Sequence, residues 1–196
     1  MTALVIDGHP NPDSLTASLA RRYAEAHGDA TVLAVRDLAF DPNLRLGYQG
    51  EQQPEPDIAR AQELIAAADH VVIAAPVWWG SIPAVLKGFI DRTFLPGWAF
   101  RYRKGGLVTG LLAGRSARVI ITTDSPMWYL QLVGDTTVRH VRGRVLRFSG
   151  FARVTATRFG PVRGSSPAQR SAWLEKVATI AASDATAAQK KLARQR

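Results

Sequence analysis

Residues 70–92 read HVVIAAPVWWGSIPAVLKGFIDR, and this stretch decides the fold class of the chain. Its first six residues form an almost continuous apolar run, which is typical of a strand covered on both faces of a parallel sheet. The pair Trp78-Trp79 follows in a segment bounded by proline and glycine, and Pro83 then suits the first turn of a helix. In a parallel sheet such a loop lies at the carboxyl edge, where ligands bind. Two large aromatic surfaces at that edge indicate a flat, aromatic ligand.

Further apolar runs of strand length occur along the chain, with amphipathic helical patterns between them. We expect strands at 2–7, 30–35, 70–75, 117–122 and 152–158, and helices at 14–27, 57–67, 83–94, 135–149 and from about 166 to the tail. This alternation predicts a doubly wound α/β protein with right-handed crossovers. Five strands favour a flavodoxin-like three-layer sandwich, with a parallel sheet in the order 2-1-3-4-5, over a six-stranded Rossmann sheet.

The segments outside these elements complete the predicted organisation. We expect one domain over residues 1–196, because the length suits a single core and no inter-domain linker is present. A long loop rich in Pro, Gly and Gln is predicted at 37–56, and another irregular stretch at 96–114. The helix predicted at 135–149 would bury Val138, Val141, Val145 and Phe148 along one stripe, and Asp57 would cap the helix at 57–67. Residues 190–196 are expected to form a frayed tail.

Composition excludes several classes of protein. The chain contains no cysteine, so disulfides, thiolate metal sites, iron–sulfur clusters and a cysteine nucleophile are excluded, and we expect no metal site. No apolar run reaches the roughly 18 residues that are needed to span a bilayer. The first residues lack the basic segment of a signal peptide and run directly into a strand. We therefore expect a cytoplasmic protein without a transmembrane segment.

Positive charge is concentrated in one part of the sequence. The net charge is +9, and no acidic residue lies between Asp135 and Glu175. Eight arginines fall in that interval, namely Arg139, Arg142, Arg144, Arg147, Arg153, Arg158, Arg163 and Arg170. Such a run is more often a solvated surface than an anion-binding one. Because neither interleaved aromatic residues nor a nucleic-acid-binding motif accompanies it, we expect no nucleic-acid partner.

Three loops are expected at the carboxyl ends of neighbouring strands, the first, third and fourth. The loop at 8–18 has no Walker A or G-x-G-x-x-G pattern, but it places hydroxyls and backbone N–H groups at a helix N-terminus, which attracts phosphate. The second loop contains the tryptophan pair, and the third, at 122–129, supplies hydroxyls and Tyr129. A phosphate cradle, an aromatic slot and a polar cap together predict a site for flavin mononucleotide.

Each candidate residue also has a structural alternative at this point. Ser14 could be an ordinary N-cap, and His9 could brace its own loop through a hydrogen bond. Tyr129, or one member of the tryptophan pair, could be a packing residue of the core.

The chain resembles the flavodoxin-like NAD(P)H:quinone reductases from Leu4 to about Phe159. The resemblance rests on His9, Ser14 and Leu15, on Pro76-x-x-Trp79, on Pro83-Ala84-Val85-Leu86-Lys87-Gly88 with Asp91-Arg92, and on Thr122-Thr123, Tyr129 and Phe148-Ser149-Gly150-Phe151. It implies a non-covalently bound flavin, FMN or FAD, in a homodimer whose active sites lie at the subunit interface. It also implies a two-electron ping-pong reaction, in which hydride passes from NAD(P)H to the flavin and then to a quinone, azo or nitro compound.

The resemblance implies roles for individual residues as well. The phosphate or ribityl chain would be contacted by His9, Ser14, Leu15 and Thr16, and the isoalloxazine ring would be lined by Pro76, Val77, Trp78, Trp79, Thr122 and Thr123. Tyr129 would face the substrate and stabilise charge on the reduced flavin. Trp79 occupies the usual aromatic position of the family, whereas Trp78 stands at a variable one.

The chain also departs from the family pattern. Asp124 and Ser125 replace two glycines, and no histidine is present to assist Tyr129. We favour FMN over FAD, because the longer carboxyl-terminal extension that helps to hold adenine in the animal enzymes has no counterpart here. The alternative is that the long loop at 37–56 serves an adenine, which would allow FAD. Two other functions share this fold and these loops: a regulatory flavoprotein subunit of a potassium-efflux system, and a flavodoxin-like electron carrier. The basic charge disfavours the carrier by analogy, because such carriers usually present acidic surfaces.

Overall fold

The computed structural model describes residues 2–50 and 52–193 of the chain. Five parallel strands form the main sheet: β1 (Ala3–Asp7), β2 (Ala30–Ala34), β3 (His70–Pro76), β6 (Ser116–Thr122) and β7 (Arg153–Phe159). Their order in the sheet is β2-β1-β3-β6-β7, which confirms the predicted order 2-1-3-4-5. The register places Asp7 beside Ala74, and Thr122 beside Pro76 on one side and Phe159 on the other. The carboxyl ends of the strands therefore share one edge of the sheet.

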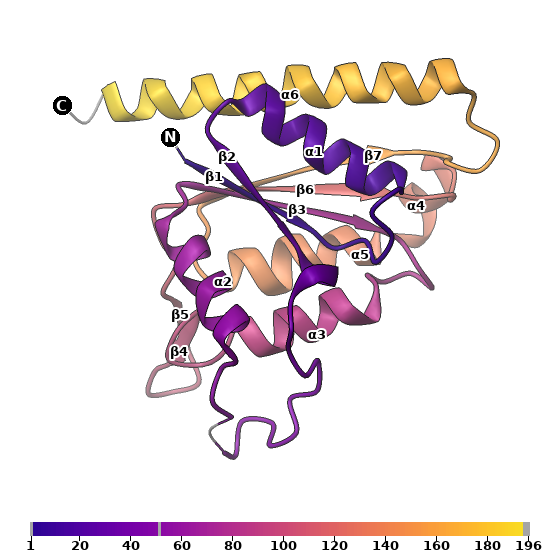
Figure 1. Cartoon of the computed structure of the whole chain (residues 1–196). Coiled ribbons are helices and arrows are strands. Elements are labelled where there is room, and N and C mark those ends of the chain that lie inside the picture. The colour runs from indigo at the N-terminus through magenta and orange to yellow at the C-terminus, as the bar shows by residue number, and fades with distance from the viewer. Residues whose placement is uncertain (1, 51, 194–196) are drawn as a thin grey trace.

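Helices cover both faces of this sheet and complete three layers (Figure 1). One face is covered by α1 (Leu15–His27) and α6 (Pro167–Ala193), and the other by α2 (Pro56–Ala67), α3 (Ala84–Thr93), α5 (Thr136–Arg139) and the π-helical segment η2 (His140–Arg147). The alternation of side chains along a strand explains this arrangement. Val5 of β1 belongs to the core beneath α1 and α6, whereas Leu4 and Ile6 belong to the core on the opposite face.

Several helices differ from the prediction made from the sequence. The helix expected at 135–149 is α-helical only over α5 and continues as η2, where the Phe148 N–H donates to the Gly143 carbonyl, five residues earlier, at 3.3 Å. The wider turn buries Leu146 and leaves Phe148 38% exposed, so the predicted apolar stripe is wrong at its last position. Helix α2 begins at Pro56, and Asp57 therefore lies inside its first turn.

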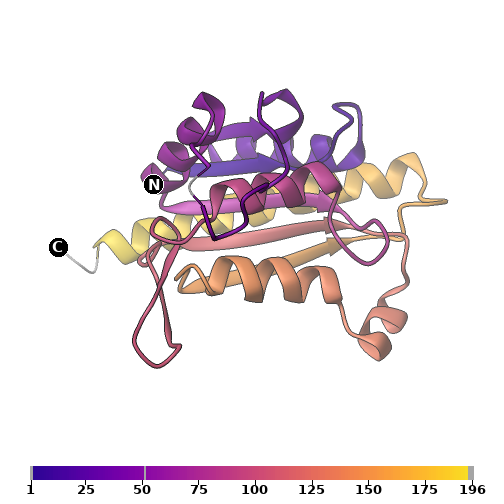
Figure 2. The same ribbon diagram turned by 90° about the horizontal axis from the view of Figure 1, so that it is seen from below.

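The stretch at 96–114 is not wholly irregular as expected, because it contains an antiparallel hairpin of β4 (Phe100–Tyr102) and β5 (Val108–Gly110). Strands of three residues are too short to produce a periodic apolar pattern. The hairpin projects from the body of the molecule (Figure 2). Helix α6 continues to Ala193, so residues 190–193 of the expected tail are helical, and 194–196 lie outside the described residues. None of the helices in the described ranges has the length and apolar character that a membrane crossing needs.

The loop at 37–56, which follows the short 3-10 turn η1 (Val35–Asp37), is fixed to α3 by a buried arginine. The side chain of Arg92 is fully buried and donates to the carbonyl oxygens of Asp41 and Gln53, at 2.9 and 3.2 Å. It also forms an ion pair with Glu55 at 2.8 Å. These contacts give the long loop a defined path across the helix.

A glycine on the same helix allows the loop to approach closely. A Cβ atom at Gly88 would stand 2.4 Å from Cβ of Pro42 and 2.7 Å from its carbonyl oxygen, so no larger residue fits without displacing the loop. The segment of α3 that carries the family resemblance therefore serves partly to hold the loop at 37–56.

Candidate functional site

Three loops meet at the carboxyl edge of the sheet, on the right in Figure 1. They follow β1, β3 and β6, which are neighbours in the sheet. Side-chain contacts join them: Thr16 Oγ1 lies 2.7 Å from Thr122 Oγ1, and the His9 ring meets Trp78 edge-on, with centroids 5.6 Å apart. The structure thus brings together residues of all three loops that the sequence pattern singles out.

A buried carboxylate at the end of β1 braces the first loop. Asp7, which is 1% exposed, accepts the His9 N–H at 3.1 Å and forms an ion pair with Arg36 at 2.6 Å. Arg36 also donates to the His9 carbonyl at 3.1 Å. Neither residue belongs to the motifs that mark the three loops in the sequence. A charge at the end of an apolar strand could have pointed to Asp7, whereas nothing in the local pattern distinguishes Arg36.

His9 braces the loop and also presents a hydrogen-bond donor. Its Nδ1 accepts the Asn11 N–H at 3.0 Å, which assigns the ring proton to Nε2. Burial lowers the pKa of His9 below its ordinary value, although the negative charge of Asp7 opposes this effect. At neutral pH the side chain is therefore a neutral donor rather than a cation.

Ser14 is the N-cap of α1, and its Oγ accepts the Ala17 N–H at 3.1 Å. The serine hydroxyl keeps its own hydrogen for donation to another group. The first N–H groups of a helix lack partners within the helix, so this terminus suits an anion. The two following side chains do not extend this surface, because Leu15 packs against the core beneath α1 and α6 and Thr16 is 1% exposed.

The two tryptophans of the second loop take different positions. Pro76 ends β3 and is buried, and the N–H of half-buried Val77 donates to the Thr122 carbonyl at 2.8 Å. Trp78 is 45% exposed and contacts His9, whereas Trp79 is fully exposed. Trp78 therefore forms a wall next to the first loop, and Trp79 projects into solvent.

A tight turn holds Trp79 in this position. Trp78 and Ser81 exchange two backbone hydrogen bonds of 2.9 Å, and the residues between them, Trp79 and Gly80, have φ angles of 51° and 72°. Positive φ at both central residues defines a type I′ turn, whose first central residue is usually Asn, Asp or Gly. Trp79 is the one residue other than glycine with positive φ in the described part of the chain. A bulky side chain in this conformation costs roughly 1–2 kcal/mol.

The turn is connected to Thr136, a residue outside the motifs of the three loops. Thr136, at the start of α5, donates its Oγ1 hydrogen to the Gly80 carbonyl at 2.8 Å across a separation of 56 residues. No local pattern could have revealed this contact, because it depends on how the two segments pack.

The third loop is attached to the connection between β7 and α6. Buried Thr123 accepts the Ser125 N–H on its Oγ1 at 3.1 Å, and its carbonyl accepts the Val162 N–H at 3.1 Å. Asp124 accepts the Arg163 N–H at 2.6 Å. Asp124 stands where the family often has glycine. Its side chain thus joins the third loop to the connection between β7 and α6.

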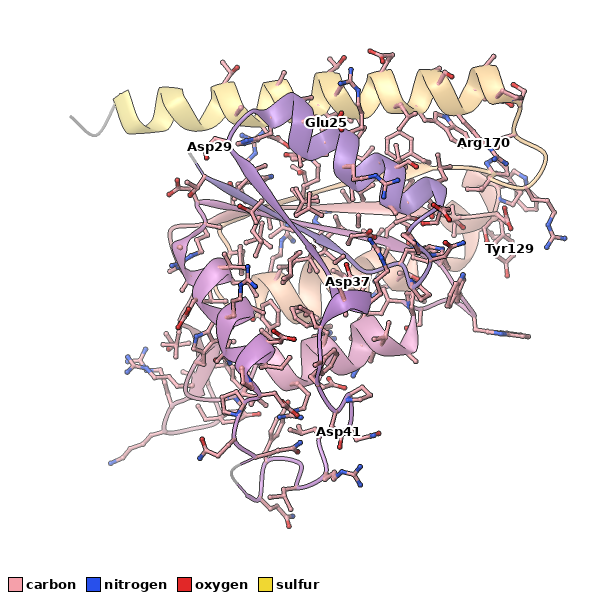
Figure 3. The ribbon with its side chains drawn as sticks, in the orientation of Figure 1. Glu25, Asp29, Asp37, Asp41, Tyr129 and Arg170 are labelled. Atoms are coloured by element: carbon pink, nitrogen blue, oxygen red, sulfur yellow. The ribbon has the colours of Figure 1, made fainter. Side chains whose placement is uncertain are left out.

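Tyr129 lies at the same end of the molecule (Figure 3), but on the helix α4 (Met127–Val133) rather than in a loop that extends to 129 as expected. This short helix stands out from the body at that end (Figure 2). Tyr129 is 44% exposed and meets Trp128 edge-on at 6.0 Å, and Leu132 is 77% exposed. Tyr129 is therefore not a core residue, and α4 presents a phenol and apolar side chains to solvent.

The eight arginines between 139 and 170 lie on several elements rather than along one helix. Two of them form ion pairs with carboxylates of the loop region, Arg158 with Asp135 and Arg163 with Asp124. Part of this positive charge therefore balances acidic groups at the carboxyl edge of the sheet.

Comparison with known proteins places these features among redox enzymes. A family model described as a flavodoxin-like fold matches residues 1–183. An uncharacterized NAD(P)H oxidoreductase of Haemophilus influenzae is 29% identical over 191 residues, which cover 91% of this chain and 93% of that protein. An FMN-dependent NADH:quinone oxidoreductase of Cereibacter sphaeroides is 34% identical over 159 residues, 74% of this chain and 76% of that protein. The crystal structure of Smu.1420 from Streptococcus mutans has a TM-score of 0.82 at 28% identity and covers 93% of this chain and 100% of its own.

Proposed function

Because this chain belongs to the family with the flavodoxin-like fold, we propose that it is a flavin-dependent NAD(P)H oxidoreductase that reduces quinones or similar acceptors by two electrons. The observation that carries the proposal is the meeting of three loops at neighbouring strands, through the Thr16–Thr122 and His9–Trp78 contacts. Relatives named NAD(P)H oxidoreductase and FMN-dependent NADH:quinone oxidoreductase support it. These names also favour an enzyme over a regulatory subunit or an electron carrier.

The groups at the first loop fit the phosphate of FMN. Ser14 has a hydroxyl hydrogen to donate, His9 offers Nε2–H, and the first turn of α1 directs N–H groups to the same side. The nearby carboxylate of Asp7 does not repel a phosphate strongly, because it is paired with Arg36. Leu15 and Thr16 contribute through their backbone, because their side chains face the interior.

The second and third loops fit a flat ring system. Half-exposed Trp78 offers one wall, and it directly follows buried Pro76 and half-buried Val77 in the chain. The Thr122 hydroxyl pairs with that of Thr16, and Thr123 Oγ1 accepts the Ser125 N–H, so hydrogen bonds hold both threonine side chains in place below the ring. A bound flavin supplies the group that accepts hydride and passes electrons to the acceptor, while the chain supplies position. Tyr129 would donate its phenolic hydrogen and so stabilise the negative charge of the reduced flavin.

The proposal includes a homodimer in which a second copy completes the site. Trp128 and Leu132 of α4 are 66% and 77% exposed and give this edge an apolar surface of the kind that marks association sites. Analytical ultracentrifugation tests this part, and a monomer at micromolar concentration with flavin bound would contradict it. We expect the reaction in the cytoplasm, where the nicotinamide donor is available.

Absorption spectroscopy of the purified protein tests the central proposal. We expect a flavin spectrum, release of FMN identified by mass, and bleaching by NADH or NADPH followed by recovery on addition of a quinone. The donor that bleaches faster in stopped flow identifies the preferred nicotinamide. A colourless protein that cannot be reconstituted with FMN or FAD would overturn the proposal.

A further inference from the structure

The hydrogen bond between Thr136 and Gly80 lies outside the residues assigned to the flavin. We propose that Thr136 is a positioning residue that holds the turn at 78–81, and that Trp79, presented by this turn, selects acceptors by the size of their rings. This inference rests on the proposed function, because it concerns which acceptors the same site admits.

The turn at 78–81 is held from two sides. Within the turn, Trp78 and Ser81 are joined by two backbone hydrogen bonds of 2.9 Å. From outside, Thr136 donates to the Gly80 carbonyl at 2.8 Å, and Thr136 Oγ1 is the nearest atom, at 3.6 Å, to where a Cβ of Gly80 would lie. The side chain of Thr136 therefore contacts the residue that follows Trp79.

Thr136 is itself fixed relative to the sheet. The preceding residue, Asp135, caps α5 by accepting the Val138 N–H at 2.9 Å, and it forms an ion pair with Arg158 on β7. The next residue, Thr137, is 2% exposed. A continuous set of contacts thus runs from the sheet through the start of α5 to the turn. Loss of the Thr136 hydroxyl removes the last contact without disturbing the others.

The turn presents its two tryptophans in different ways. Trp78 contacts His9 and faces the first loop. Trp79 is fully exposed and sits in a backbone conformation that Asn or Gly adopts more easily. Because the strained backbone and the exposed ring do not stabilise the fold, they indicate that the Trp79 ring has a role in function. Trp79 follows Trp78 directly and projects into solvent, so we take its ring as the part of this loop that an acceptor would meet first.

One experiment removes the hydroxyl of Thr136 while keeping its shape. In Thr136→Val, we expect KM for a fused two-ring quinone to change by about tenfold, the equivalent of one neutral hydrogen bond, with flavin content unchanged. Amide hydrogen exchange at 78–81 should accelerate in this variant, a readout that does not depend on activity. Thr136→Ser, which keeps the hydroxyl, should restore both values. If Thr136→Val matches the wild type in KM and in exchange, the positioning role is wrong.

A second experiment changes the displayed ring. In Trp79→Asn the thermal midpoint should stay equal or rise, because Asn suits the turn, while the ratio of kcat/KM between a two-ring and a one-ring quinone should shift severalfold. Trp78→Asn is the matched comparison and should weaken FMN binding instead. Equal changes for both quinones in Trp79→Asn would overturn the selection role. A wild-type protein that binds no flavin would overturn the proposed function, and the exchange measurement would still decide whether Thr136 positions the turn.

Discussion

Arg92 donates to both carboxylate oxygens of Glu55, at 3.0 and 2.8 Å, although its own side chain is fully buried. Burial alone would raise the pKa of Glu55, but hydrogen bonds from its backbone and from Arg92 outweigh this and lower it. Removal of Glu55 leaves a buried charge without its partner. We expect Glu55→Ala to reduce the free energy of unfolding by about 3 kcal/mol, as measured by denaturant titration.

An ion pair on the same helix provides the control for this prediction. Lys87 and Asp91 are 2.6 Å apart, but their side chains are 44% and 38% exposed. Lys87→Ala should therefore cost less than about 1 kcal/mol. Equal losses in the two variants would show that burial of Arg92 does not set the strength of its pairing.

Acidification should destabilise the protein between pH 6.5 and about 4. Burial lowers the pKa of His70 from 6.5 to about 4, despite the opposing charge of Asp184, and burial also lowers the pKa values of His27 and His140. The unfolded chain takes up these protons first, so the stability is fully present above pH 6.5 and is lost as the pH falls toward 4. His70 alone corresponds to about 3 kcal/mol. Denaturant titrations across this range should show a flatter dependence in His70→Gln, and an unchanged slope would contradict the assignment.

Substitutions at Ser14 can separate its capping role from a contact with phosphate. Because Oγ caps α1, Ser14→Ala should cost about 1 kcal/mol of stability, whereas Ser14→Gly should cost only a few tenths. Both variants lack the hydroxyl and should weaken FMN binding by the same factor, measured by fluorescence titration. An affinity that follows stability rather than the hydroxyl would assign Ser14 to capping alone.

The hydrogen bond between Thr16 and Thr122 should contribute to stability through its burial. Thr16→Val leaves the Thr122 hydroxyl buried without its partner and should lower the free energy of unfolding by about 1–3 kcal/mol. The double variant Thr16→Val/Thr122→Val removes both hydroxyls and should lie closer to the wild type. Additive losses in this double-mutant cycle would rule out coupling between the two side chains.

Tyr129→Phe tests the phenol without removing the ring. Because Tyr129 is 44% exposed and contacts Trp128 only through its ring, stability and flavin content should not change. One of the two half-reactions should slow in stopped flow, because the hydrogen-bond donor is lost. Unchanged rates in both half-reactions would remove Tyr129 from the reaction.

The sheet and the meeting of the loops could be predicted because they follow from periodicity and topology. The apolar run from Val71 to Ala75 is buried on both faces, as a central strand requires, and the order of strands then places the loops after β1, β3 and β6 at one edge. Ser14 and His9 follow from their residue types, since each has a local hydrogen-bonding partner that a loop sequence suggests.

The rest depends on contacts between distant segments. The Thr16–Thr122 hydrogen bond joins residues 106 apart, and Arg36 reaches Asp7 across 29 residues, so no local pattern indicates either. The turn at 78–81 could not be predicted for another reason. Its usual sequence signal is Asn-Gly, and here Trp79 takes the first central position. The π-helical segment could not be predicted from the sequence, because its residues suit an α-helix equally well.

The attachment of the loop at 37–56 to α3 also bears on how this protein can change. The loop is held at one end through Asp41 and Pro42 and at the other through Gln53 and Glu55, while the Arg45 N–H donates to Gln52 within the span between. The entropy of closing a loop grows only logarithmically, so doubling that span adds about 0.6 kcal/mol. Its length and sequence can therefore be altered while α3 and the loop at its amino end keep their places. The chain thus contains a natural insertion point, where a new recognition segment can be grafted beside an unchanged scaffold.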